Sequence, residues 1–584
     1  MLVMKKLAVV VVIAFLAAGG AFLYFRFFRT PFPETVFPEN TTAYVYLSDV
    51  TLAGKGLERT QLWKAIEESP RKQVYKKELD RAIGVLEGLT GLNVRTLFSH
   101  FTREVALGIV SKEKSSVHAV FSAYVDDESE ANKLIDEKME PGIRRRIPDL
   151  NKQQVQYSGN TYYKYSSNRY PRATFCYSFQ GGRFIAANSE EGMRTVLDVR
   201  NGKARALRDS ELFRDAKESI AFRHGLFFFV DAQSVLQVAH SAFPSGLSRL
   251  WPALVKIGGL ESLRSFCYGV TIKNEGFVEE GFLEVGDNPS GLLKIYLDQN
   301  PERLDSLRSI PADTKIFRAG TLADFAKMWD DINAQLGSVL THDEYERWQK
   351  LMNAARGFFN FDVRRDLLEP IGNEFAFCYD ASERGGSDPS KMRYLVLLRL
   401  RKPDQFRETL NRFVSLASFR GMQKSEEMYK SKKLQIVRMN IGQLSVSPAY
   451  FLEGSWFYFS SESSFLRKAI DTADQDNNIT DVKDYQKVTD DFPDEINSLS
   501  YTDVQAYFRM YGSILRKQGS EQGNRWLQEY RLDQEFEDLG KNLFGSASYS
   551  KIQEDGIYIY TYSSVPTSIM ALPVLLTKLP QFLQ

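Results

Sequence analysis

The chain has 584 residues, which is enough for roughly three to four domains of ordinary size or two large ones. Lysine and arginine total 75 against 74 aspartate and glutamate, so there is no basic surplus and we expect no nucleic-acid partner. Aromatic residues make up 13% of the chain, which favours sheet-rich structure, with an aromatic groove for a lipid, peptide or glycan as the alternative. Three scattered cysteines without a CxxC pair (Cys176, Cys267 and Cys378) indicate neither a disulfide framework nor a zinc site.

The first thirty residues predict a membrane anchor. Lys5 and Lys6 precede an uncharged, mostly apolar run over 7–25, which at 1.5 Å per residue approaches the thickness of a bilayer's hydrocarbon core. A cleaved signal peptide is the alternative, because 17–20 reads Ala-Ala-Gly-Gly. The apolar run continues beyond that point, so we expect an uncleaved signal anchor over 1–30.

The lysine pair places the N-terminus in the cytoplasm, although Arg26 and Arg29 on the far side weaken the charge asymmetry. A proline-containing tether over 31–36 follows. We therefore expect a single-pass membrane protein with the rest of the chain outside the cytoplasm.

Beyond the tether, strand and helix patterns alternate without regular βαβ spacing. Strand-like runs occupy 42–49, 103–110 and 115–125, and glycine-containing turns at 159–160 and 181–182 predict two further hairpins. Helical spacing appears at 77–89, 127–139, 330–359 and 402–417, and further strands are expected at 314–320 and 392–400. The pattern predicts an α+β fold with mostly antiparallel sheets and helices over one face of each sheet.

One pattern recurs along the chain at an offset of 269 to 280 residues. "NVRTLFSHFTREVALGI" from Asn93 resembles "DVRRDLLEPIGNEFAFCY" from Asp362. The paired positions are Pro38 and Pro311, Thr41 and Thr314, Thr51 and Thr321, Val94 and Val363, Glu104 and Glu374, Ser189 and Ser461, Asp231 and Asp503, and Gly276 and Gly556. Their collinear order predicts two tandem, duplicated units over 37–300 and 311–584, joined by a linker over 301–310. Chance echoes within any α+β protein are the alternative.

A search for chemistry returns no catalytic, cofactor or metal residues. No HExxH, GxSxG or complete phosphate loop is present, and "LAGKGLERT" from Leu52 reads as a helix N-terminus. His342 and Glu346 lie four residues apart, a spacing that suits a solvated surface pair better than a metal site. Asp231 and Asp503 each separate a strand-like run from a helical one, where an N-cap belongs.

Several stretches resemble the bacterial membrane-anchored envelope proteins of domain of unknown function family 3352. They are the apolar run at 7–25, "FPENTTAYVYLSD", "GLTGLNVRTLF" before "EVALGIV", and "DSELFRDAKES" followed by "GLFFFVDAQSVL". The resemblance implies a single-anchor envelope protein without an assigned activity, held in the bacterial inner membrane with the bulk of the chain in the periplasm. It brings no catalytic residues. We therefore expect a non-enzymatic, membrane-tethered protein that binds an envelope protein or an apolar ligand. An envelope hydrolase or a lipid carrier is the alternative.

Overall fold

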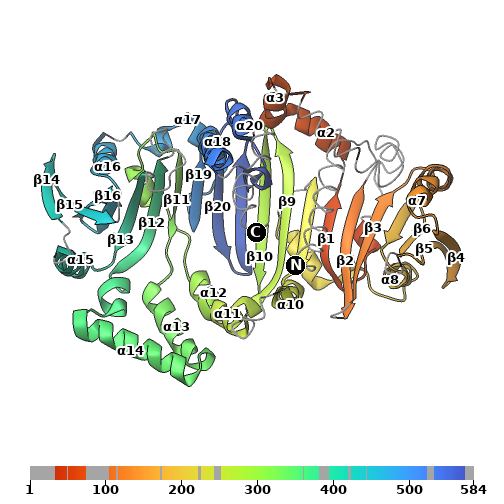
Figure 1. Ribbon diagram of the computed structural model, residues 1–584, viewed down its shortest axis with the longest axis horizontal. Helices are drawn as coiled ribbons and strands as arrows, with labels where there is room; N and C mark the ends of the chain where they lie inside the picture. Colours follow the sequence, from red (N-terminus) through yellow and green to blue (C-terminus); the bar gives the residue numbers. More distant parts are fainter. Residues whose placement is uncertain are drawn as a thin grey trace. The chain divides into compact units, whose positions relative to one another are not determined.

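The computed structural model describes residues 33–571 except 49, 71, 74–83, 85–103, 114–115, 171–173, 221–224, 243–250, 360, 381–392, 419–422, 442–443, 476 and 522–531. Two compact units emerge: residues 1–245 with 263–285 form unit 1, and 246–262 with 286–584 form unit 2 (Figure 1). The sequence placed 246–262 and 286–300 in the first unit. They group with unit 2 because helices from these segments, α11 (Trp251–Gly258) and α12 (Gly291–Leu297), pack on each other and on α13 (Phe325–Val339).

The described residues of unit 1 contain ten antiparallel strands in the spatial order β4-β5-β6-β7-β3-β2-β1-β8-β9-β10. The strands are β1 (Thr41–Leu47), β2 (Val105–Glu113), β3 (Ser116–Tyr124), β4 (Asn151–Tyr157), β5 (Asn160–Ser166), β6 (Phe175–Phe179), β7 (Arg183–Ala187), β8 (Leu226–Asp231), β9 (Leu263–Lys273) and β10 (Gly276–Val285). Both expected glycine hairpins are present. The β6–β7 turn places Gly181 and Gly182 at φ 59° and 76°, a left-handed backbone that glycine adopts at little cost.

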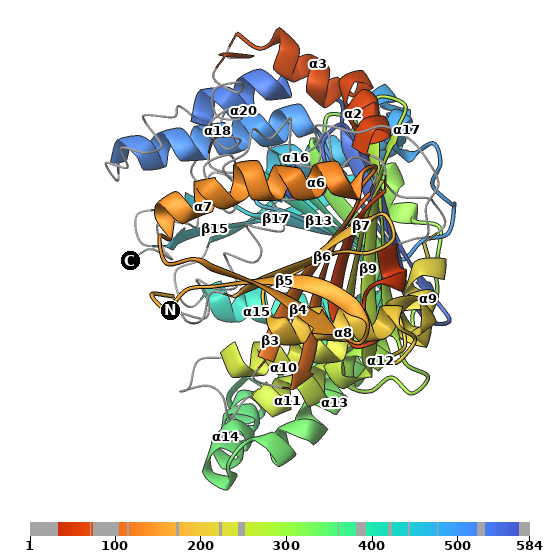
Figure 2. The ribbon, with the colours of Figure 1, turned by 90° about the vertical axis from the view of Figure 1, so that its right-hand side faces the viewer.

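Helices lie against both faces of the unit 1 sheet, where the sequence predicted one. The helices are α2 (Val50–Arg59), α3 (Gln61–Glu68), α6 (Glu128–Leu134), the π-helix η2 (Ile135–Met139), α7 (Glu140–Arg146), α8 (Glu190–Arg200), α9 (Glu211–Glu218) and α10 (Ala232–Ala242). Phe213 of α9 packs edge-on against Tyr44 and Phe229 on one face. Helix α6 packs over Tyr177 and Phe184 on the other face, and Figure 2 shows α6 and α9 on opposite sides of the strands.

Unit 2 has the spatial strand order β14-β15-β17-β18-β13-β12-β11-β19-β20-β21, again antiparallel throughout, with the short β16 paired to β15. The strands are β11 (Ile316–Thr321), β12 (Ile371–Asp380), β13 (Arg393–Leu400), β14 (Gln423–Tyr429), β15 (Lys432–Ile441), β16 (Leu444–Val446), β17 (Ala449–Glu453), β18 (Trp456–Ser460), β19 (Ser498–Thr502), β20 (Ser546–Gln553) and β21 (Gly556–Ser563). The α+β class and the antiparallel sheets predicted from the sequence are therefore confirmed.

The remaining helices of unit 2 surround this sheet. They are α14 (His342–Phe359), the π-helix η7 (Val363–Leu368), α15 (Pro403–Ser418), α16 (Ser463–Gln475), α17 (Lys483–Thr489), α18 (Val504–Glu521) and α20 (Leu532–Gly540). Helices α16 and α17 pack on the face that carries Phe317, Ala376, Leu397 and Tyr501, all of which are buried. The helical pattern over 330–359 is interrupted at Leu340 and Thr341, which separate α13 from α14.

The two spatial orders correspond strand for strand when β1–β10 are matched to β11–β15 and β17–β21. The segment that leads into the first strand is also alike in the two units. Pro38 bridges Ala206 and Pro311 bridges Asn478, while the next N–H group in each unit, Leu207 or Ile479, donates to the carbonyl before that proline at 2.7 and 3.0 Å. The strand registers carry the correspondence across the whole sheet at offsets of 270 to 280 residues.

Most of the paired positions that the structure describes occupy corresponding places. Asp231 and Asp503 both cap a helix, accepting from the N–H three residues ahead at 3.4 and 2.9 Å. Glu104 precedes β2, whereas Glu374 lies inside β12, just before regular pairing resumes at Phe375.

Three other pairs behave differently. Asn188, rather than Ser189, corresponds to Ser461, because each side chain accepts from the matching strand N–H, that of Ala119 or Tyr394. Thr51 lies in α2 whereas Thr321 ends β11. Val94 lies outside the described residues.

The predicted membrane anchor at 7–25 also lies outside the described residues. Within the described part of the chain, no helix combines the length and apolar character needed to cross a bilayer.

Candidate functional site

One face of the unit 2 sheet carries large apolar side chains that the helices leave partly open. Strand alternation buries Phe317, Ala376 and Leu397 on the opposite side. The open side carries Phe375, Phe377 and Tyr379 from β12, Tyr394, Val396 and Leu398 from β13, and Phe457 and Phe459 from β18. Phe377 is 39% exposed, and its ring stacks at 6.1 Å on that of Tyr394. We call this side the open face of unit 2.

A single row of cross-strand neighbours runs over the middle of the open face. From β20 to β17 the directly opposed residues are Ser548, Ser500, Arg318, Phe377, Val396, Phe459 and Tyr450. Directly opposed side chains on one face lie close enough to touch a common ligand. We call this set the central row; hydroxyl groups occupy one end and apolar groups the other.

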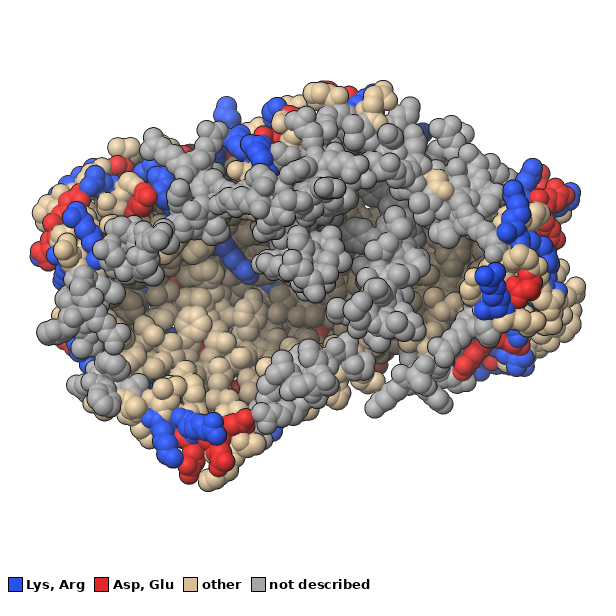
Figure 3. All heavy atoms as spheres, viewed as in Figure 1, with Lys and Arg blue, Asp and Glu red and all other residues tan. Residues whose placement is uncertain are grey.

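Helices frame this face without closing it. Phe406 of α15 packs on Phe457 at 5.1 Å between ring centroids, which covers one end. Burial, followed by the neighbouring Tyr511 of α18, raises the pKa of Tyr379. Figure 3 shows the surface over β11–β13 and β19–β20 as hollowed and mostly uncharged, with charged side chains gathered on α14 at its lower rim.

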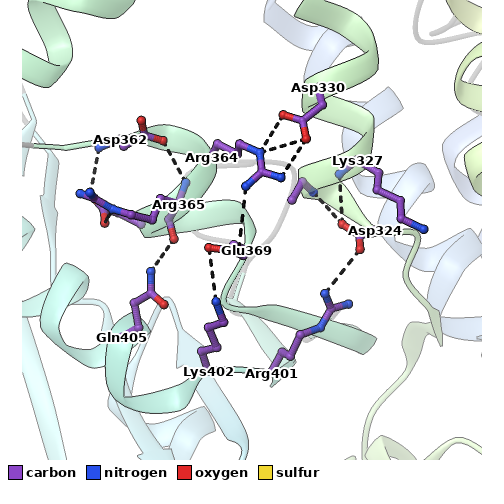
Figure 4. Close-up of polar contacts among 12 residues, drawn as sticks. Asp324, Lys327, Asp330, Asp362, Arg364, Arg365, Glu369, Arg401, Lys402 and Gln405 are labelled. Carbon is purple, nitrogen blue, oxygen red and sulfur yellow. Dashed lines mark hydrogen bonds and ion pairs between the residues drawn. The ribbon is translucent and has the colours of Figure 1, made fainter.

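An ion-pair network fixes the π-helix η7, which directly precedes β12 in the chain (Figure 4). Arg364 donates from Nε and Nη2 to Asp330 of α13 at 2.7 and 2.8 Å, and its Nη1 lies 3.9 Å from Glu369. Lys402 lies 3.4 Å from the same glutamate and Arg401 lies 3.4 Å from Asp324.

The pKa of Asp324 reflects its place in this network. Burial raises it, but the N–H groups of Lys327 and Ala326 together with Arg401 bring it below its usual range. Each carboxylate here has a cationic or N–H partner, so the network joins η7 to α13 and to the residues just before α15, and it offers no free acid–base pair. Arg364 belongs to the repeated Val-Arg motif, which therefore has a structural role in unit 2.

A buried glutamate occupies corresponding positions in both units. Glu104 is ion-paired with Arg183, and both side chains are buried. Glu374 accepts from the Ser306 N–H at 2.7 Å and lies 3.4 Å from Arg399. Burial raises the pKa of Glu374 despite these partners. Glu104 lies on the face of the unit 1 sheet on which α9 packs, and Glu374 lies on the face of the unit 2 sheet opposite to the open face.

The residues considered from the sequence do not assemble a reactive centre. His342 lies 3.5 Å from Glu346 at an exposed surface, where Lys350 is a second partner of the same carboxylate. The three cysteines are unpaired and buried; burial raises the pKa of Cys176 to about 11 and that of Cys267 to about 12. In the parts of the chain that the structure describes, no group of three His, Cys, Asp or Glu side chains is arranged to hold a metal ion.

One polar trio was not found from the sequence. Ser189 Oγ lies 2.7 Å from His118 Nδ1, and His118 Nε2 lies 3.3 Å from Glu191 Oε2, without hydrogen-bond geometry. Ser189 also caps α8, accepting from the Gly192 N–H at 3.0 Å. These residues come from a strand and a helix start about 70 positions apart, so no local motif reveals them.

Unit 2 has a different arrangement at the corresponding positions. There Arg393 lies 3.9 Å from Glu462, so the serine and histidine are not repeated. Capping accounts for the geometry of Ser189, since its oxygen is engaged at the helix end.

Comparison with known proteins agrees with the resemblance noted in the sequence. Residues 380–534 match the family model described as "Protein of unknown function (DUF3352)". No curated protein matches. Two similar solved structures are "Structure of crystal form I of TP0453" and "Structure of crystal form III of TP0453". Their identities are 11% and 12%, their TM-scores are 0.25 and 0.23, and each alignment covers 46% of this chain and 84% or 85% of the other.

Proposed function

We propose that this chain is a non-enzymatic protein of the bacterial envelope, tethered to the inner membrane by 7–25, that binds an apolar ligand through unit 2. The apolar length and the lysine pair of the N-terminal segment support the tether. The matched family model is described only as a protein of unknown function, which fits a chain without an assigned activity.

The observation that carries the binding role is the aromatic end of the open face. Phe377 remains 39% exposed in the middle of a sheet, and Val396 and Phe459 follow it in the central row. Exposing a large apolar side chain costs about 1.5–3 kcal/mol relative to burying it. A contiguous set of such side chains in a hollow is typical of a ligand or partner site.

We also infer that the two units arose by duplication. The shared strand order, the matching proline bridges and the paired helix caps support this inference. Duplication accounts for an apolar face in both units, since the residues of unit 1 that correspond to the central row are apolar or aromatic. They are Tyr268, Phe228, Val45, Leu107, Phe121, Ala186 and Tyr177.

Site-specific photo-crosslinking in cells tests the binding role. A benzoylphenylalanine at position 377 should capture an apolar molecule or a partner segment. The same residue at position 351, where Leu351 is 60% exposed on α14, is the matched control. Equal adducts at both positions, or none at 377, would contradict a binding face at the aromatic end.

A further inference from the structure

Arg318 is an isolated cation in the middle of the open face of unit 2. It lies in β11 directly between Ser500 and Phe377, and its side chain is exposed. Phe317 and Ala319 on either side of it in the chain point to the buried face. Among the described residues, no carboxylate forms an ion pair with Arg318.

The strands of the open face carry very little charge apart from Arg318. At the strand positions of the open face in β11–β13 and β17–β21, Arg318 is the one charged side chain that the structure describes. An arginine cation is permanently charged and offers a planar fork that fits a carboxylate. One unpaired positive charge is balanced by one negative charge, which favours a monoanion over a dianionic phosphate.

Free hydroxyl groups flank the cation on one side. Ser500 and Ser548 follow Arg318 in the central row, and neither side chain has a hydrogen-bond partner within the described residues. By contrast, the hydroxyl groups of Ser498 and Ser550 on the same two strands bond to each other at 2.6 Å. The two free hydroxyls are therefore available to donate to an anion held by Arg318.

Apolar groups extend the row on the other side. Phe377, Val396, Phe459 and Tyr450 lie on the four successive strands after that of Arg318. At a strand spacing near 4.8 Å, the track from Arg318 to Tyr450 is therefore about 19 Å long. Such a track suits an extended alkyl chain lying across the strands. The far end of the row is closed by Tyr450, which is 5% exposed.

We propose that the open face of unit 2 binds a fatty acid, with its carboxylate on Arg318, Ser500 and Ser548 and its alkyl chain over Phe377, Val396 and Phe459. This inference rests on the proposed apolar-ligand function and adds a class of ligand to it. Unit 1 provides an internal contrast, because Val45 stands where unit 2 has Arg318. Unit 1 therefore offers no cation for the head group at that position.

Photoaffinity labelling of the full chain in neutral phosphatidylcholine nanodiscs tests the proposal. The probe is a palmitate with a diazirine near its methyl end, and the matched neutral probe is the corresponding hexadecanol. Palmitate should label peptides of β13, β17 and β18, and Arg318→Gln should lower that labelling about tenfold or more through loss of a charge-assisted contact. Arg214→Gln, an exposed arginine on α9 of unit 1, is the control and should change nothing.

The possible outcomes separate this inference from the proposed function. If both probes label these strands equally and Arg318→Gln has no effect, the fatty-acid inference is wrong while an apolar binding face remains. If unlabelled phosphatidylglycerol displaces the palmitate probe more effectively than unlabelled palmitate does, the ligand is a phospholipid and the inference is again wrong. If neither probe labels unit 2 above unit 1, the proposed apolar-ligand function fails as well.

Discussion

Removing the Arg183 charge should lower the stability of unit 1, because Arg183 is the ion-pair partner of a buried glutamate. Arg183 is ion-paired with Glu104, and the two residues are 3% and 5% exposed. Arg183→Met keeps the apolar stem and removes the charge, which leaves the Glu104 carboxylate buried without its cation. The corresponding change in unit 2 is Arg399→Met, which removes a partner of Glu374.

The structure predicts different costs for these two changes. Breaking a fully buried ion pair typically costs about 3–5 kcal/mol, because the remaining charge is desolvated and uncompensated. Arg399 is 35% exposed, and burial already raises the pKa of Glu374, so its loss should cost only about 1–2 kcal/mol. The double variant Glu104→Gln/Arg183→Met should recover part of the loss, because no buried charge remains.

Native-state hydrogen exchange measures each unit separately, which a single unfolding transition of a two-unit chain does not. Peptides of β2, β3 and β7 should exchange roughly 100- to 3,000-fold faster in Arg183→Met, from the conversion of about 1.4 kcal/mol per tenfold. Peptides of β12 and β13 should change less in Arg399→Met. Equal effects in the two units, or a double variant no better than Arg183→Met alone, would refute the reasoning.

Three further predictions concern other parts of the chain. Contacts led by Lys164 hold the pKa of Glu190 at about 2, so Glu190→Gln should destabilise unit 1 at pH 7; the difference should fade as pH falls from about 4.5 towards 2, measured by hydrogen exchange at each pH. Solvent screening keeps this effect below the ideal value of about 3 kcal/mol, since the side chain is 29% exposed. Gly108→Ala places a Cβ 2.4 Å from the Phe37 ring and should cost about 1–3 kcal/mol in denaturant unfolding, with partial rescue by Phe37→Ile. Protease added to spheroplasts should degrade everything beyond about residue 30, and the mature protein should retain its first twenty residues; protection or cleavage would contradict the uncleaved anchor.

Local patterns in the sequence predicted local structure well. The glycine pair at 181–182 predicted its hairpin, because few other residues adopt two successive positive φ angles. Asp231 and Asp503 were predicted as helix caps from their place between a strand pattern and a helix pattern, and both are. In such cases the residue's own conformational preference determines the structure, so no distant contact is needed to predict it.

The candidate binding face could not be predicted in this way. Its central row draws residues from β20, β19, β11, β12, β13, β18 and β17, which are scattered over more than 200 positions. "TKIFRAG" predicts a strand, but only the register with β12 and β19 places Arg318 between Phe377 and Ser500. Register in a many-stranded sheet is set by burial on one face, and a single sequence shows that burial only as weak alternation.

With the proposed duplication, the comparison of the two units indicates how the proposed binding face arose. On the side of each sheet that carries the buried glutamate, the two units keep the same local chemistry by exchanging residues between neighbouring strands. Unit 1 places an arginine on β7 opposite Tyr124 of β3, whereas unit 2 places Arg399 on β13 opposite Trp456 of β18, and each arginine still reaches the buried glutamate.

Side-chain volume on that side is exchanged in the same way. In unit 1 the large Phe37 packs over Gly108, whereas unit 2 has the smaller Ile310 at the first position and the larger Cys378 at the second. On the other side no such compensation occurs: Val45, Phe228 and Tyr268 of unit 1 correspond to Arg318, Ser500 and Ser548 on the open face of unit 2. A closely packed core tolerates only compensated changes, whereas a face open to solvent is free to change its chemistry. The uncompensated side is therefore where a new specificity would arise, and that is where the lone cation lies.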